Sequence, residues 1–209
     1  MKHTLILILS LFTAVASWAQ SFEGEIIYAN TYKSKAPNVT DEQWSSMMGN
    51  TYNYYIKGAQ YKSVANGQLV QWQLYRSADN KLHSKLANSE AAFWNDGGVN
   101  EDTVLKSEIK KGAVEILGYK CDELTLTCKN GVQKYYYSSK LAVDPKLYVN
   151  HKFGNWYDML MLTKSMPLKM IVDAPQFSME SVATAVKPAK LEDKFFELPA
   201  GMQTQKSPY

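Results

Sequence analysis

Few residues of this sequence have the types and spacing that catalysis requires. His151 stands in an Asn-His-Lys segment with Asp144 and Asp158 close by in the chain, the best local match to the base and acid of a hydrolase. No Gly-x-Ser-x-Gly elbow, HExxH motif, P-loop or Gly-rich dinucleotide loop accompanies these residues. An exposed loop histidine is the simpler interpretation, so an envelope hydrolase that uses His151 is the least favoured hypothesis.

The adjacent carboxylates Glu101 and Asp102 are the next candidates. Neighbours on a strand point to opposite faces, so these two cannot act together as an acid and base pair. A solvated loop after the Asp96-Gly97-Gly98 turn is the simpler interpretation, although distant carboxylates could still meet in the fold. We therefore expect a protein that is not an enzyme, with no catalytic residues, metal site or cofactor.

The two cysteines, Cys121 and Cys128, raise the question of a disulfide. The residues between them, DELTLT, contain no turn former and alternate like a strand. Seven strand steps span roughly 23 Å, whereas a disulfide needs Cα atoms roughly 4.4 to 6.8 Å apart. The pair is also a poor match to zinc-site spacings. We therefore expect two free thiols.

Methionines are concentrated around one apolar segment, with five of them between residues 159 and 179. Methionine is flexible and suits surfaces that adapt to varied apolar partners, so these side chains could line a cavity for an acyl chain. The alternative is that they fill irregular gaps where a helix packs on a sheet. The candidate ligand-binding residues are Trp156, Met159, Leu160, Met161, Met166 and Met170.

Tyrosines form two further groups, at residues 52–61 and 135–137. Because side chains alternate along a strand, Tyr136 must face away from Tyr135 and Tyr137. Exposed rings can stack on sugars, which makes a glycan- or protein-binding envelope module the alternative functional hypothesis. Ordinary cross-strand packing of the rings is the structural alternative.

Alternating apolar residues place most of these side chains on β-strands. The pattern begins at Phe22 and returns in short segments separated by turn signals such as Asn66-Gly67 and Asn130-Gly131. A capping box at Thr40 and Gln43 predicts a helix of about two turns. The fold class is mainly β (α+β), with a curved, partly closed antiparallel sheet wrapped against one or two helices.

A helical insertion interrupts the strands near residues 144–166. Asp144-Pro145 is typical of a helix start, and apolar residues recur at helical spacing from Trp156 until Pro167, where the helix is expected to end. A helix this apolar must be covered, and the sheet is the expected cover. Strands then return, and the last one is predicted at Phe195-Phe196.

Length and composition fit one exported domain. The chain has 209 residues, 45% of them hydrophobic, and a net charge of +3, which disfavours nucleic acid as a partner. Residues 1–19 are predicted to be a signal peptide, with cleavage near Ala19-Gln20. A single antiparallel-sheet domain at 20–209 remains, periplasmic or secreted and without a transmembrane segment. The sequence makes no prediction of oligomeric state.

Three motifs in order resemble those of a known exported family. They follow an opening Gly24-Glu-Ile-Ile-Tyr28 and read Ile116-Leu-Gly-Tyr-Lys-Cys121, Met166-Pro-Leu-Lys-Met170 and Phe195-Phe-Glu-Leu-Pro-Ala-Gly-Met202. Together they resemble the family called domain of unknown function 4412. The resemblance implies a fold similar to the periplasmic lipoprotein carriers (LolA-like), in which a curved antiparallel sheet half-encloses helices and holds acyl chains. It implies no catalytic residues.

The leading hypothesis is a non-enzymatic protein that binds an apolar ligand, a lipid or a lipoprotein acyl chain, between the sheet and the helix. Burial of apolar surface at roughly 25 cal/mol per Å² would drive binding with few polar contacts.

Overall fold

The computed structural model describes residues 21–208, so the predicted signal peptide lies outside the described residues. The described chain forms twelve strands, two α-helices and three short 3-10 helices. The strands are β1 (Gly24–Ser34), β2 (Thr51–Lys57), β3 (Gln60–Ala65), β4 (Val70–Arg76), β5 (Lys81–Leu86), β6 (Ala92–Asp96), β7 (Val104–Ile116), β8 (Tyr119–Cys128), β9 (Gly131–Ala142), β10 (Ser165–Asp173), β11 (Phe177–Pro188) and β12 (Thr204–Lys206). The helices are α1 (Asp41–Met48), α2 (Trp156–Thr163), η1 (Pro145–Tyr148), η2 (Phe153–Asn155) and η3 (Asp193–Phe196).

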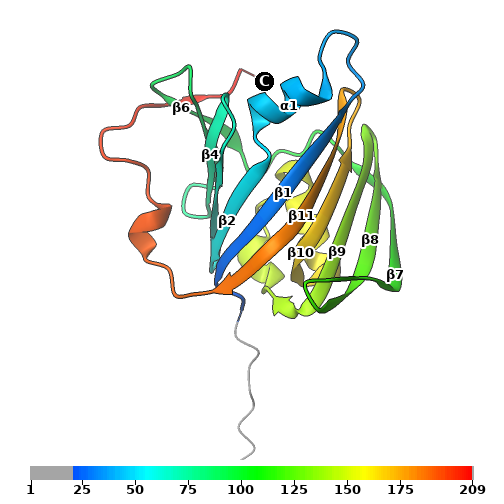
Figure 1. The fold of residues 1–209 in the computed structure, drawn as a ribbon. Helices are drawn as coiled ribbons and strands as arrows, with labels where there is room; N and C mark the ends of the chain where they lie inside the picture. Colours follow the sequence, from blue (N-terminus) through cyan, green and yellow to red (C-terminus); the bar gives the residue numbers. More distant parts are fainter. Residues whose placement is uncertain (1–20, 209) are drawn as a thin grey trace, which may run out of the picture.

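All twelve strands belong to one open sheet (Figure 1). The strand order is β12-β6-β5-β4-β3-β2-β1-β11-β10-β9-β8-β7, and neighbours run antiparallel except for β12 and β6, which are parallel. The predicted mainly β fold, with an antiparallel sheet and two α-helices, is confirmed. The predicted partial closure of the sheet is wrong, because β7 and β12 are its two free edges.

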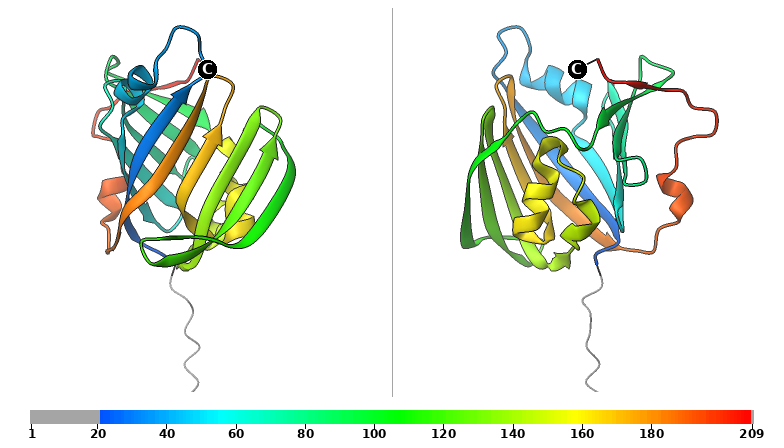
Figure 2. Two further views of the ribbon diagram at one scale, coloured as in Figure 1. Left: turned by 45° about the vertical axis from the view of Figure 1, so that its right-hand side comes forward. Right: turned by 180° about the vertical axis from the view of Figure 1, so that it is seen from behind.

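One face of the sheet packs against α2, and we call it the inner face. Figure 2 shows α2 between the two halves of the sheet, with β2 on one side and β7–β9 on the other. The core lies on this face, where Ile26, Ile56 and Leu124 have no exposed surface. Both cysteines are buried and unbridged, as predicted. No helix among residues 21–208 is long and apolar enough to span a membrane.

Helix α1 begins and ends where the sequence predicts. The Thr40 hydroxyl accepts a hydrogen bond from the Gln43 N–H at 3.2 Å, and Gln43 Oε1 accepts one from the Thr40 N–H at 2.7 Å. These two bonds form the capping box, which satisfies N–H groups that a helix start leaves unpaired. Gly49 follows the last helical residue.

The predicted two-residue hairpin at Asn66-Gly67 is wrong. The favoured turn for this dipeptide needs a positive φ at both residues, and neither residue has one. Instead, the connection between β3 and β4 packs against the end of α1. The N–H groups of the next two residues donate to the carbonyls of Ser46 and Met47 at 2.8 and 2.9 Å. These bonds satisfy carbonyls that a helix end leaves unpaired.

This packing leaves no room for a side chain at Gly67. A Cβ there would lie 2.5 Å from the carbonyl oxygen of Met47. We expect Gly67→Ala to lower the free energy of unfolding by about 2 kcal/mol, because the loop or the helix end must shift. Urea unfolding followed by tryptophan fluorescence measures the loss.

Gly58→Ala is the matched control, since Gly58 also lies in a turn between two strands. No atom lies within 4 Å of a Cβ at Gly58, and its φ is 54°, so the substitution should cost only about 1 kcal/mol of backbone strain. Equal losses in the two variants would contradict the packing of the β3–β4 connection on α1.

The helical insertion predicted near residues 144–166 is present but broken into pieces. Asp144 caps the short helix η1, with its carboxylate accepting a backbone N–H at 3.0 Å. Helix α2 begins only at Trp156 and stops before Lys164, whose φ of 52° is left-handed. Pro167 does not end the helix as predicted, because it already belongs to β10.

The segment after β11 runs along the outer face of the β2–β5 half of the sheet (Figure 1). The strand predicted at Phe195-Phe196 is wrong, because these residues form η3. On a strand the two rings would point to opposite faces, whereas here their centroids lie 5.4 Å apart. Phe196 is only 2% exposed and anchors the segment. The chain then reaches the sheet edge, where β12 pairs with β6.

Candidate functional site

The six predicted ligand-binding residues do not form one surface. Met159, Leu160 and Met166 are at most 1% exposed and belong to the core. Met161 faces solvent with 44% of its surface exposed. Trp156 and Met170 are half-buried at the margin of the core.

Trp156 belongs to an aromatic cluster around His151. The imidazole of His151 stacks on the Tyr75 ring, with centroids 3.8 Å apart and an interplanar angle of 7°. Its Nε2 atom lies 2.8 Å from the Tyr61 hydroxyl, and Trp156 packs on Tyr61 with centroids 4.8 Å apart. Because these rings cover it, His151 has no exposed surface, so the prediction of an exposed loop histidine is wrong.

The buried imidazole of His151 is uncharged at neutral pH. Burial lowers its pKa to about 3, and the nearby Gly97 carbonyl offsets part of this effect. Neither Asp144 nor Asp158 hydrogen-bonds to the ring, so the geometry lacks the acid that orients a catalytic histidine. In the described part of the chain, no group of three or more His, Cys, Asp or Glu side chains could hold a metal ion.

The tyrosines of the two predicted groups pack into the sheet. Tyr61, Tyr135 and Tyr137 are at most 7% exposed. Tyr136 faces the other way, as predicted, with the Lys169 amino group 5.6 Å from its ring centroid. The remaining members of both groups are half-buried. These strands therefore present no row of fully exposed tyrosines.

A strip of the inner face between α1 and α2 is less fully covered. It consists of cross-strand neighbours on β1, β11 and β10, and we call it the inner strip. Its members are Asn30, Met170, Val172, Met179 and Ser181. The three apolar side chains are half-buried, whereas Asn30 and Ser181 are 3% and 1% exposed.

The two polar side chains of the inner strip make no hydrogen bond of acceptable geometry with another described residue. The Tyr32 hydroxyl lies close to the Asn30 amide but does not satisfy it. Buried polar groups in folded proteins are normally paired with protein or water. These polar atoms are themselves buried, so the part of the strip that is open to a ligand consists of the three half-buried apolar side chains.

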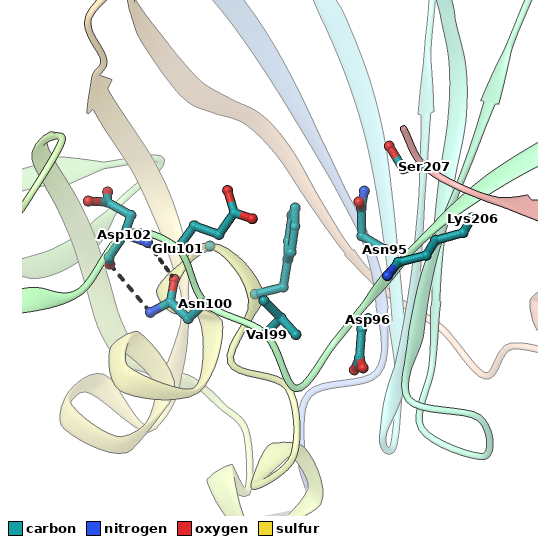
Figure 3. Close-up of a pocket in the computed structure, with 10 residues that line it drawn as sticks. Asn95, Asp96, Val99, Asn100, Glu101, Asp102, Lys206 and Ser207 are labelled. Carbon is teal, nitrogen blue, oxygen red and sulfur yellow. Dashed lines mark hydrogen bonds between the residues drawn. The ribbon is translucent and has the colours of Figure 1, made fainter. Parts of the chain in front are cut away.

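Two adjoining clefts, each of about 480 Å³, open beside β6. They share Asn95 of β6 and Ser207, which follows β12. In the first cleft, Figure 3 shows Asn95 and Glu101 on two sides of the opening, with Lys206 reaching toward β6 from the C-terminal strand. The second cleft lies over β4–β6 and is lined by Gln73, Ser84 and Phe93 among others. None of the six predicted ligand-binding residues lines either cleft.

Hydrogen bonds fix the loop that borders the first cleft. The Gly97 carbonyl accepts the Phe153 N–H at 3.0 Å. The Asn100 amide donates to Asn155 Oδ1 at 2.7 Å. Asn155 is fully buried, and its own amide donates to Gln133 Oε1 at 3.3 Å. The walls of this cleft are therefore preformed, as is usual for ligand sites.

No family model and no curated protein sequence matches this chain. Among solved structures, PNGF-II is similar with a TM-score of 0.47 and 14% identity, over 88% of this chain and 31% of PNGF-II. An uncharacterized conserved protein from Thermus thermophilus has a TM-score of 0.48 and 7% identity, over 90% of this chain and 93% of that protein. Lipoprotein LppX of Mycobacterium tuberculosis has a TM-score of 0.32 and 9% identity, over 80% and 90% of the two chains.

These likenesses are too distant to assign a function to the chain. The chain also spans less than a third of the length of PNGF-II, at 31%. The resemblance of its motifs to the domain of unknown function 4412 stays a prediction.

Proposed function

We propose that the mature chain is an exported, non-enzymatic protein of the cell envelope that binds an apolar ligand, a lipid or a lipoprotein acyl chain. The ligand lies along the inner strip, beside α2 rather than beneath it. The observation that supports this proposal is the row of half-buried apolar side chains on β10 and β11. Export is supported by the signal-peptide pattern of residues 1–19.

The chemistry of the inner strip suits a molecule with a long apolar part. Met170, Val172 and Met179 offer apolar surface, and methionine adapts to chains of different shape. Covering that surface contributes roughly 25 cal/mol per Å² of apolar area.

The core residues that the sequence singles out have a supporting role in this proposal. Leu160 and Met159 hold α2 against the sheet, so they position one border of the strip. Trp156 stacks on Tyr54 with centroids 6.0 Å apart, and both its indole nitrogen and the Tyr54 hydroxyl lack hydrogen-bond partners among the described residues. Both of these polar atoms are buried, so the two rings contribute to the packing beside the strip.

A charge placed on the inner strip should abolish most of the binding. We expect Val172→Glu to weaken the affinity for dansyl-labelled undecanoic acid by about tenfold or more, because its carboxylate would lose water against an acyl chain. Fluorescence titration of the purified mature protein measures the affinity.

Ile171→Glu is the matched control, since Ile171 is the preceding residue of β10, equally half-buried, and points to the outer face. This variant should bind the probe within about twofold of the wild type, a difference of a few tenths of a kcal/mol. Failure of the wild-type protein to take up the probe, or an equal loss of affinity in both variants, would contradict the proposal.

A further inference from the structure

We infer that the two clefts beside β6 form a binding site for an oligosaccharide that is uncharged or carries amino groups. This site is separate from the inner strip, because none of the five inner-strip residues lines either cleft. The inference therefore stands or falls independently of the proposed lipid binding.

The second cleft has the chemistry that recognises sugar hydroxyls. Gln73, Ser84 and Asn95 line it with uncharged groups that both donate and accept hydrogen bonds, as hydroxyls do. The Gln73 amide donates to the Ser84 hydroxyl at 3.1 Å, which fixes the orientation of both groups. Phe93 adds an aromatic ring, whose negative face attracts the C–H groups of a pyranose ring.

The first cleft adds carboxylates and a second aromatic ring. Glu101 and Asp96 line it together with Phe153, which is 36% exposed. Glu101 makes no hydrogen bond or ion pair with another residue of the described chain, so its carboxylate is available to a ligand. Carboxylates accept strong hydrogen bonds from hydroxyl and ammonium groups.

The charge of the first cleft sets the class of sugar. Asp96, Glu101 and Asp102 outnumber Lys206 among its lining residues. An anionic sugar, such as a uronic acid or a sulfated unit, would be repelled by this excess of negative charge. The hydroxyl groups of a neutral sugar can donate hydrogen bonds to the carboxylates. The ammonium groups of an amino sugar are also attracted to the negative charge of the carboxylates.

The two clefts together provide an extended and rigid site. Each has about 480 Å³, within the range of roughly 300 to 1,000 Å³ that is usual for small-molecule sites. Asn95 stands where they meet, so one ligand can occupy both clefts along its length. The bond from Asn100 to buried Asn155 holds one wall before the ligand arrives, which lowers the entropic cost of binding.

Calorimetric titration with three defined tetrasaccharides tests this inference. The wild-type protein should bind tetra-N-acetylchitotetraose, which is uncharged, and its fully deacetylated, amine-bearing form, and it should not bind tetragalacturonic acid. Asn95→Ala should weaken both interactions by about tenfold or more, since Asn95 contacts both clefts and its loss leaves a partner hydroxyl unpaired. Glu101→Gln should weaken binding of the amine-bearing sugar more than binding of the N-acetylated sugar, because the substitution removes a negative charge and keeps the shape of the side chain.

Asn38→Ala is the matched control, an exposed asparagine outside both clefts, and it should bind like the wild type. Circular dichroism and an unchanged melting temperature verify that Asn95→Ala folds, since Asn95 makes no side-chain hydrogen bond to another described residue. Absence of binding to all three sugars, binding that survives Asn95→Ala, or preference for tetragalacturonic acid would overturn the inference.

Discussion

As the pH falls from 7 to 4, the free energy of unfolding should decrease by about 3 kcal/mol, because His151 binds a proton in the unfolded chain but not in the folded one. The imidazole has a pKa of 6.5 when unperturbed and about 3 in the fold. Above pH 6.5 it is neutral in both states and contributes no pH dependence. As the pH falls from 6.5 to 3, the unfolded chain binds a proton that the folded chain excludes, so stability decreases through this window. His151 has no exposed surface, so solvent does not screen the effect.

His151→Phe isolates the contribution of this residue from that of other acid-sensitive groups. A phenyl ring keeps the stacking on Tyr75 but cannot bind a proton, and it leaves the Tyr61 hydroxyl without its partner. The variant should therefore be less stable at pH 7 and should lose less stability on acidification. Urea unfolding at several pH values measures both proteins. Burial also lowers the pKa of His83, so acid sensitivity remains in the variant. Parallel pH profiles for the two proteins would contradict the assignment.

Local patterns predicted those elements whose geometry depends on adjacent residues. The capping box at Thr40 and Gln43 is found where the sequence places it. The chain also reverses near Asn130, but one residue earlier than the Asn130-Gly131 pattern predicts, because Gly131 is already the first residue of β9 and pairs with Cys128. The β7–β8 turn was missed because Leu117 has a φ of 51°, a conformation that leucine seldom adopts. Asn66-Gly67 has a typical hairpin sequence, but contacts with the end of α1 determine its conformation.

The candidate sites depend on contacts between distant parts of the chain, which a single sequence does not reveal. Alternation correctly predicted that Tyr136 would face away from its neighbours. Alternation could not predict that Asn30 lies beside Ser181, because β1 and β11 are neighbours in the sheet but far apart in the sequence. The polar residues next to His151 in the sequence suggested an exposed side chain, whereas Tyr61 of β3 and Tyr75 of β4 enclose its imidazole. The clefts likewise combine β6, the 97–102 loop and the C-terminal segment.

Leu160→Ala should lower the free energy of unfolding by about 3 kcal/mol, within the usual 2 to 5 kcal/mol for a buried leucine. Leu160 has no exposed surface and lies on the side of α2 that packs against the sheet. For a protein of this size the melting temperature should fall by about 6 to 12 °C. The loss measures the packing of α2 and not its helical tendency, because alanine favours a helix at least as well as leucine. Differential scanning calorimetry of the mature protein gives both quantities.

Met161→Ala distinguishes a core residue from a ligand contact on the same helix. Met161 is the next residue but is 44% exposed, so its replacement should change stability by no more than about 0.5 kcal/mol. If the apolar side chains of α2 formed the binding surface, Met161→Ala would weaken the fatty-acid probe and Leu160→Ala would cost little stability. The structure predicts instead that Leu160→Ala lowers stability, because Leu160 is enclosed by the core. It also predicts that Met161→Ala leaves probe binding unchanged, because the half-buried apolar row lies on β10 and β11. A large stability loss in Met161→Ala would show that α2 packs on the sheet through a different side.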